Sequence, residues 1–191
     1  GYDAADFDGP APAPDGFFNI THTGLFAKDG NPLKLWKVLG EMPEEFRTKL
    51  RIRLVGTVDR EVLEAISANG LADNVVELGY LDHAAAIREQ RTATILLLPL
   101  RNDPQYRPIL PGKLFEYLAS RRPILGIGQT DGAMARVIAE AQAGETFDWD
   151  DEAGIRRFLE KEPRQTEGNI EKYTRENLTA ELARLLESIS K

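Results

Sequence analysis

Short apolar runs alternate along the chain with segments whose apolar residues recur every three or four positions. The runs that predict strands are Phe17–Gly24, Arg51–Val58, Asn74–Tyr80, Thr94–Leu100, Pro123–Gly128 and a weaker candidate, Glu145–Trp149. The helical segments between them are residues 31–42, 59–70, 83–91, 111–120 and 132–143. The alternation predicts right-handed βαβ units, and hence a doubly wound, Rossmann-like α/β domain of about six parallel strands flanked by helices. Residues 94–100 are apolar at nearly every position, as in a central strand buried on both faces.

The two ends of the chain differ from this pattern. The first sixteen residues are acidic and rich in proline and alanine, which indicates a linker or arm, so we expect the domain to span residues 17–191. Such a start suggests a piece of a longer protein. The last two helical patterns, residues 150–162 and 177–190, have solvated outer faces and are expected to pack on the outside of the domain.

Composition and charge narrow the classes of partner. The net charge of −7 and the pI near 5.0 argue against nucleic acid as the main partner, because phosphate backbones require a basic surface. The chain has no cysteine, which excludes disulfides and thiol chemistry. Its longest apolar runs are too short to span a bilayer and no signal peptide is visible, so we expect a cytoplasmic protein.

A lysine stands where a helix N-terminus disfavours positive charge. Pro111 fits the first helical position, Gly112 allows close approach to the backbone, and Lys113 then lies in the first turn. Together with Arg107, Lys113 would form an anion site. Glu116 lies on the same side of the helix, where it could accept hydrogen bonds from ribose or sugar hydroxyls. The alternative is a Lys113–Glu116 surface pair with Arg107 in a solvated loop.

The sheet-facing side of this helix is expected to carry Leu114, Phe115 and Leu118. Residues 126–132, "GIGQTDG", resemble a dinucleotide fingerprint but have the wrong spacing. They favour a flexible loop whose amides could contact a phosphate, with Asp131 or Gly132 capping the next helix. Residues 148–150, "DWD", could hold a divalent cation, but helix capping by neighbouring acidic residues is the favoured interpretation.

The remaining candidates are two histidines and two lysines. His22 ends the first predicted strand, at the expected ligand edge, and could contact a ligand or simply be accommodated in the fold. His22 and His83 show no metal-ligand spacing, so no metal site is expected. Lys28 and Lys34 follow the first strand and are either phosphate ligands or ordinary surface lysines.

The run "LPGKLFEYLASRRPIL" resembles the donor-binding motif of GT-B glycosyltransferases, in particular of the retaining family numbered four. Members of that family show a P-x-K-x-x-E-Y-L-A segment before a P-I-L strand. "ITHTGLFAKDGNPLKLWKVL" is similar to the first strand and glycine loop of their carboxyl-terminal domain, and "GYDAADF" is similar to the linker that precedes it. The likeness covers nearly the whole chain.

The resemblance implies a nucleotide-diphosphate-sugar-binding half of a retaining glycosyltransferase. The donor would be a nucleotide sugar, and the acceptor, a glycan or lipid, would bind to an amino-terminal domain that lies outside this chain. The class generally needs no bound metal or other cofactor, because basic side chains and a helix dipole stabilise the leaving diphosphate. Peripheral membrane association of the full-length enzyme is compatible with this class, and the isolated chain is expected to transfer no sugar.

Matching the motif residue by residue assigns roles within the donor site but identifies no catalytic residue. Glu116 matches the glutamate that holds the ribose hydroxyls, and Lys113 lies where the helix N-terminus meets the diphosphate. Gly24 matches the glycine loop, and Lys28 or Lys34 could neutralise the diphosphate. Pro108 replaces the first glutamate of the family's pair, which departs from the usual recognition of the sugar.

Other function classes predict different sequence features. A non-catalytic Rossmann-like nucleotide-binding or interaction module is the main alternative. A NAD-linked dehydrogenase would need a glycine fingerprint after the first strand, which "HTGLFAKDG" lacks. A nucleotide-sugar epimerase would need acidic catalytic groups that the sequence does not reveal.

Overall fold

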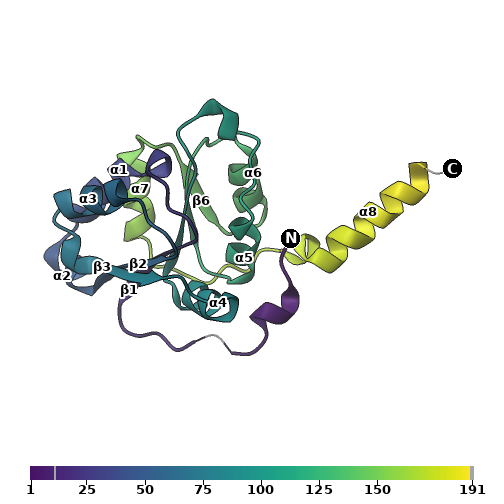
Figure 1. The fold of residues 1–191 in the computed structure, drawn as a ribbon, viewed down its shortest axis with the longest axis horizontal. Helices are drawn as coiled ribbons and strands as arrows, with labels where there is room; N and C mark the ends of the chain where they lie inside the picture. Colours follow the sequence, from purple (N-terminus) through teal and green to yellow (C-terminus); the bar gives the residue numbers. More distant parts are fainter. Residues whose placement is uncertain (11, 190–191) are drawn as a thin grey trace.

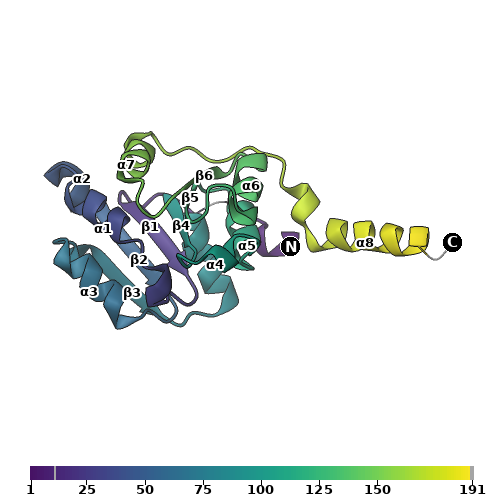
Figure 2. The same cartoon turned by 90° about the horizontal axis from the view of Figure 1, so that it is seen from above.

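Within the residues that the computed structural model describes, 1–10 and 12–189, six strands form one all-parallel sheet in the order β3-β2-β1-β4-β5-β6 (Figures 1 and 2). The strands are β1 (Phe18–Thr23), β2 (Leu50–Val55), β3 (Val75–Gly79), β4 (Ile95–Pro99), β5 (Ile124–Ile127) and β6 (Gly144–Phe147). This topology confirms the predicted doubly wound α/β fold. The weak candidate at residues 145–149 is a strand that begins one residue earlier.

The helices follow the predicted pattern with one addition. They are α1 (Leu33–Gly40), α2 (Glu44–Lys49), α3 (Arg60–Ala68), α4 (His83–Thr92), α5 (Lys113–Ala119), α6 (Ala133–Glu140), α7 (Glu152–Glu160) and α8 (Arg175–Ile189). Short 3₁₀ turns are η1 (Ala4–Phe7), η2 (Lys28–Gly30), η3 (Ala72–Asn74), η4 (Pro104–Tyr106) and η5 (Glu171–Tyr173). The hydrophobic pattern does not predict α2, because the six residues of this helix include a single apolar side chain, Phe46.

Two layers of helices cover the sheet. Helices α1, α3 and α7 pack on one face, and α5 and α6 pack on the other with α4 beside them (Figure 2). Strand β4 contributes to both layers, because Ile95 and Leu97 point into the first and Leu96 and Leu98 into the second. The expectation of a central strand buried on both faces is therefore confirmed.

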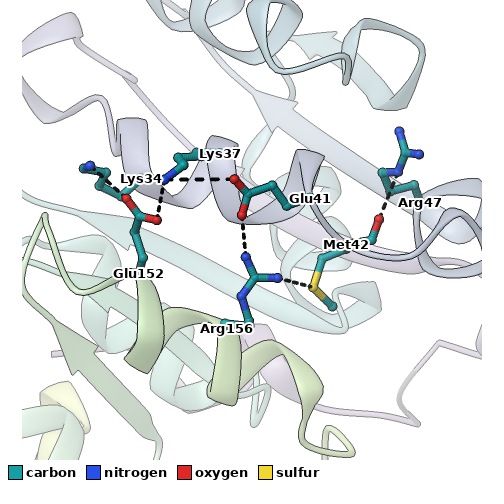
Figure 3. A network of polar contacts seen from close by, with 7 residues as sticks. All are labelled: Lys34, Lys37, Glu41, Met42, Arg47, Glu152 and Arg156. Atoms are coloured by element: carbon teal, nitrogen blue, oxygen red, sulfur yellow. Dashed lines mark hydrogen bonds and ion pairs between the residues drawn. The ribbon is translucent and has the colours of Figure 1, made fainter.

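Ion pairs join α7 to α1 across the outer surface (Figure 3). The carboxylate of Glu152 binds the ammonium groups of Lys34 at 2.8 Å and Lys37 at 2.7 Å, and these contacts lower the pKa of Glu152 to about 2. Arg156 binds Glu41 at 2.6 Å one turn further along. Lys34 thus belongs to the contact between two helices, which favours the ordinary-lysine interpretation over a phosphate ligand.

The two C-terminal helices behave differently. Helix α7 packs as predicted and buries Ile155, Phe158 and Leu159. Helix α8 buries no residue and extends away from the domain (Figures 1 and 2), so the expectation that it packs on the outside is wrong. Its apolar residues recur on one side, which specifies a helix but not the surface that covers it. Ser190, the last residue of the predicted helix, lies outside the described residues. No helix in the described chain combines the length and apolarity that crossing a bilayer requires.

The N-terminal arm is docked on the domain. Tyr2 is buried, its N–H donates to the carbonyl of Tyr173, and its carbonyl accepts from Arg175 N–H. Further along, Asp6 contacts His83 at 2.8 Å, and Arg91 donates to the carbonyl of Gly9. The arm is therefore held against α4 and the start of α8, while the domain boundary at residue 17 stays a prediction. Ala11 lies outside the described residues.

Candidate functional site

The strand order reverses between β1 and β4, and the two strands separate at their carboxyl ends. Strand β1 pairs with β2 along all six of its residues but with β4 only at Ile20–Ile95 and Thr21–Leu96. Ligands of open α/β sheets bind in the crevice that such a reversal creates. Because the pairing between β1 and β4 ends at Thr21 and Leu96, the backbone groups beyond these residues need side-chain partners for their hydrogen bonds.

Tyr117 provides one of these partners. Its hydroxyl oxygen accepts a hydrogen bond of 2.9 Å from the N–H of Thr23, the last residue of β1. The ring is fully buried, and burial raises the pKa of its hydroxyl to about 12. Tyr117 therefore ties α5 to the end of β1 as a neutral group.

The buried stripe of α5 differs from the sequence prediction. Leu114, Tyr117 and Leu118 are buried, whereas Phe115 is half-buried and stacks on Tyr173 with ring centres 5.7 Å apart. Positions 114, 117 and 118 share one helical face, and position 115 lies about 100° away from position 114 around the axis. Phe115 therefore lies at the edge of this buried face and packs against the core from there, so the expected stripe is correct for Leu114 and Leu118 and omits Tyr117. Pro111 also lies outside the helix, because Gly112 is the N-cap and Lys113 the first helical residue.

Replacing Tyr117 by phenylalanine is expected to destabilise the protein by about 1–3 kcal/mol, because the buried N–H of Thr23 loses its acceptor. Urea unfolding measures the change. Tyr80→Phe is the matched control, since Tyr80 is 92% exposed and should tolerate the loss of its hydroxyl. Equal stability of the two variants would show that the hydroxyl of Tyr117 does not hold β1.

His22 provides the second partner. Its Nδ1 lies 3.1 Å from the carbonyl oxygen of Leu97, and its Nε2 lies 3.3 Å from the carbonyl oxygen of Leu25. Nε2 also faces the ammonium of Lys113, which can only donate, so in the neutral ring Nδ1 carries the proton. Nε2 is then the acceptor for the ammonium of Lys113, 3.2 Å away. Burial, with a smaller effect of Lys113, lowers the pKa of His22 to about 3 and keeps the ring neutral. These contacts favour the interpretation of His22 as a histidine accommodated in the fold, and they place its ring directly against the ammonium of Lys113.

The two histidines are expected to give stability opposite dependences on pH. The unfolded chain protonates His22 near pH 6.5, but the folded chain resists protonation down to about pH 3, so folding should lose about 2 kcal/mol between pH 7 and pH 5. His22→Gln should remove this loss. The hydrogen bond that His83 donates to the carboxylate of Asp6 raises the pKa of His83, so His83 stabilises the fold at low pH and loses this effect as the pH rises through its folded pKa. Chemical unfolding at pH 5 and 7 tests both, and an acid loss that persists in His22→Gln would contradict the assignment.

Lys113 lies directly over the loop that follows β1. A Cβ atom built on Gly24 would be 3.1 Å from the ammonium nitrogen of Lys113. Burial lowers the pKa of Lys113 to about 8, with Glu116 acting weakly in the opposite direction. Within the described residues Lys113 forms no ion pair, so the alternative of a Lys113–Glu116 surface pair is wrong.

A cleft of about 320 Å³ opens at the carboxyl ends of β1, β2 and β3. It is lined by Thr23, Gly24, Val55, Gly56, Tyr80, Leu81, His83, Ala86, Gln90, Lys113 and Glu116. A second hollow of about 210 Å³ lies on the other side of Lys113, toward His22, Arg101 and Ile109. Lys113 borders both hollows, and its ammonium therefore stands at the centre of the edge where ligands of this fold bind.

Other predicted residues have partners away from the cleft. Arg107 is 61% exposed and forms an ion pair with Asp131, and Lys28 pairs with Glu61 at 3.4 Å. Neither Arg107 nor Lys28 lines the cleft beside Glu116, so their roles as donor ligands stay predictions that require these ion pairs to open. Gly112 is exposed with open space at its Cβ position, next to Lys113.

The acidic and glycine-rich loops cap helices. Gly132 is the N-cap of α6, and the carboxylate of Asp151 accepts from Gly154 N–H at 2.8 Å to cap α7. The capping interpretation of this acidic segment is confirmed. In the described part of the chain, no three or more histidine, aspartate or glutamate side chains gather to hold a metal ion. The expectation that no metal or cofactor takes part stays a prediction.

Solved glycosyltransferase structures share this fold. WaaG, a glycosyltransferase of lipopolysaccharide biosynthesis, superposes with a TM-score of 0.60 at 17% identity, over 76% of this chain and 37% of WaaG. The C-terminal domain of LpcC, a group 1 family glycosyl transferase from Francisella tularensis, gives 0.61 at 13% identity, over 83% of this chain and 86% of that domain. HepE from Anabaena, solved in complex with UDP, gives 0.60 at 17% identity, over 84% of this chain and 46% of HepE. No protein-family model and no curated protein matches the sequence.

These similarities establish the fold and no more, because the sequence identities are low. The chain spans less than half of WaaG and of HepE, but most of the LpcC domain. The expected likeness to the carboxyl-terminal domain of glycosyltransferases is confirmed at the level of the fold. The narrower likeness to the retaining family four stays a prediction.

Proposed function

We propose that this chain is the nucleotide-diphosphate-sugar-binding half of a retaining glycosyltransferase that transfers a sugar to a glycan or lipid acceptor. The observation that carries the proposal is the cleft in which the Lys113 ammonium lies over Gly24 while Glu116 lies one turn along the same helix. The shared fold of LpcC and HepE, the latter in complex with UDP, supports it. A cytoplasmic location and peripheral membrane association of the full-length enzyme belong to the same proposal.

The cleft offers complementary chemistry to the parts of a nucleotide sugar. Lys113 supplies the positive charge for the diphosphate, and Gly24 leaves the backbone accessible beneath it. In sugar transfer the diphosphate leaves, and a fixed cation stabilises the charge that develops on it. The carboxylate of Glu116 accepts hydrogen bonds from ribose hydroxyls. Pro108 offers no carboxylate to the transferred sugar, so other groups must recognise the hydroxyls of that sugar.

Calorimetric titration with UDP, GDP and ADP tests the donor site. One of the three is expected to bind saturably, and both Glu116→Gln and Lys113→Ala should weaken it. Glu64→Gln and Lys161→Ala are matched controls, because Glu64 and Lys161 lie in exposed ion pairs with Arg60 and Glu145 that do not line the cleft. Absence of binding, or equal effects of site and control substitutions, would remove the basis of the proposal.

The isolated chain is expected to bind the donor but to transfer no sugar, because in the proposed enzyme the acceptor would bind to a separate domain outside residues 1–191. Incubation with the nucleotide sugars of the base selected by titration, followed by detection of released nucleoside diphosphate, measures this. Sustained transfer by the purified chain to any glycan or lipid would contradict the expectation.

A further inference from the structure

A buried glutamine on α4, Gln90, connects Glu116 on α5 with Thr23 at the end of β1. Gln90 is 1% exposed, and its Nε2 lies 3.0 Å from Oε2 of Glu116 and 3.3 Å from Oγ1 of Thr23. On the other side of the amide, Oε1 lies 3.2 Å from the hydroxyl of Ser120. A carboxylate can only accept, so the nitrogen must face Glu116 and the orientation of the amide is determined.

The amide engages only one of the two carboxylate oxygens of Glu116. Among the described residues, Oε1 of Glu116 has no hydrogen-bond partner, although the side chain lines the cleft. A free glutamate has several rotamers, and fixing one of them on binding costs free energy. Gln90 fixes the rotamer before the ligand arrives and leaves one oxygen available.

The neutrality of Gln90 matters for this role. An arginine or lysine at position 90 would pair with the carboxylate and compete with ligand hydroxyls, whereas an amide donates one hydrogen bond and leaves the negative charge in place. The same amide also contacts Thr23, the residue before Gly24. Gln90 therefore sets the position of the carboxylate relative to the loop beneath the Lys113 ammonium.

We infer that Gln90 is a positioning residue that holds Glu116 so that its free oxygen meets the vicinal hydroxyls of the ligand's ribose. The inference rests on the proposed function, because it assigns the hydroxyls of a nucleoside diphosphate to Glu116. It predicts that Gln90, which is buried beneath the cleft, controls how strongly the protein distinguishes ribose from a sugar without these hydroxyls.

A comparison of UDP with 2′,3′-dideoxyuridine diphosphate by calorimetry tests the role, and the corresponding pair replaces them if titration selects another base. The wild type should bind UDP at least tenfold more tightly than the dideoxy compound. Gln90→Met should lower the affinity for UDP about five- to twentyfold, which is the effect expected from losing the contact between Gln90 and Glu116. It should change the affinity for the dideoxy compound less than twofold. Gln165→Met, at an exposed glutamine, should change neither.

A second variant keeps the test decisive if Gln90→Met folds poorly. Gln90→Glu preserves the size but places two carboxylates at hydrogen-bond distance, so that one of them takes up a proton as the pH falls. Protonated, the new side chain can donate to Glu116 as the amide does. Relative to the wild type at the same pH, UDP affinity of Gln90→Glu should be within twofold at pH 5.5 and about tenfold lower at pH 8.

The failures of the two proposals are distinguishable. If Gln90→Met weakens the binding of UDP and of its dideoxy analogue equally, Gln90 does not position Glu116 and the donor site stands. The same conclusion follows if Gln90→Met weakens the binding of neither compound while Glu116→Gln removes the preference for UDP. If no nucleoside diphosphate binds the wild type, the donor site and the role of Gln90 both fall.

Discussion

Replacing Lys113 by methionine is expected to stabilise the fold and to remove most of its affinity for a nucleoside diphosphate. Burial lowers the pKa of Lys113 from 10.5 to about 8, so at pH 7 the charged side chain costs the folded state about 3 kcal/mol relative to the unfolded chain. Methionine has a similar length and no charge. Because Nε2 of His22 loses its donor, which costs about 1 kcal/mol, the net gain should be about 1–3 kcal/mol.

The pH dependence of the unfolding free energy shows whether the buried charge of Lys113 causes this gain in stability. Between about pH 8 and pH 10.5 the folded protein releases the proton of Lys113 while the unfolded chain retains it, so wild-type stability should rise with pH in this interval. Lys113→Met should lack the rise. Urea unfolding at pH 7 and 9.5 measures it, with Lys161→Met as a control at a lysine that is 60% exposed. A destabilised variant that keeps the rise would contradict the prediction.

Ligand binding should respond in the opposite direction. A charge-assisted contact to a diphosphate contributes about 1.5–3 kcal/mol, so Lys113→Met should lower the affinity for the nucleotide about 10- to 150-fold. Wild-type affinity should also decrease above about pH 8, because Lys113 loses its charge there. The stability cost of this lysine is then the counterpart of its role in binding, as at other functional sites.

Gly56→Ala is expected to destabilise the protein by about 3–5 kcal/mol, through a strained backbone and a steric clash. Gly56 has a φ of +107°, and a Cβ atom there would lie 2.6 Å from the carbonyl oxygen of Gly24, which has a φ of +91°. The added methyl group must push apart the loops after β1 and β2. Since Gly24 lies under the Lys113 ammonium, nucleotide affinity should fall as well.

Gly70→Ala separates the two contributions. Gly70 also has a positive φ, +72°, but no atom lies within 4 Å of the Cβ position, so this variant reports backbone strain alone and should lose about 1–2 kcal/mol. Thermal and urea unfolding of both variants measure the difference. Equal losses at the two positions would show that the loops move apart freely and that the close approach of Gly24 and Gly56 is not needed.

Local patterns in the sequence are sufficient to predict the sheet and the helix that carries the candidate site. Alternating strand and helix periods specify a parallel α/β fold, and the apolar run at residues 94–100 specifies a central strand, because both are local patterns that topology rules extend to the whole domain. The same local logic places Lys113 and Glu116 on one side of α5, at the carboxyl edge of the sheet where ligands of this fold bind.

The side chains that contact Lys113 and Glu116 could not be predicted from local patterns, because they come from other parts of the fold. His22 and Gln90 reach Lys113 and Glu116 from distant parts of the chain, while Arg107 and Lys28 pair with acids elsewhere. Helical and strand periods indicate which face a residue occupies but not which residue lies opposite. The separation of β1 from β4, which leaves backbone groups for Tyr117 and His22, and the projection of α8 away from the domain depend on packing between distant segments, which a local pattern does not encode.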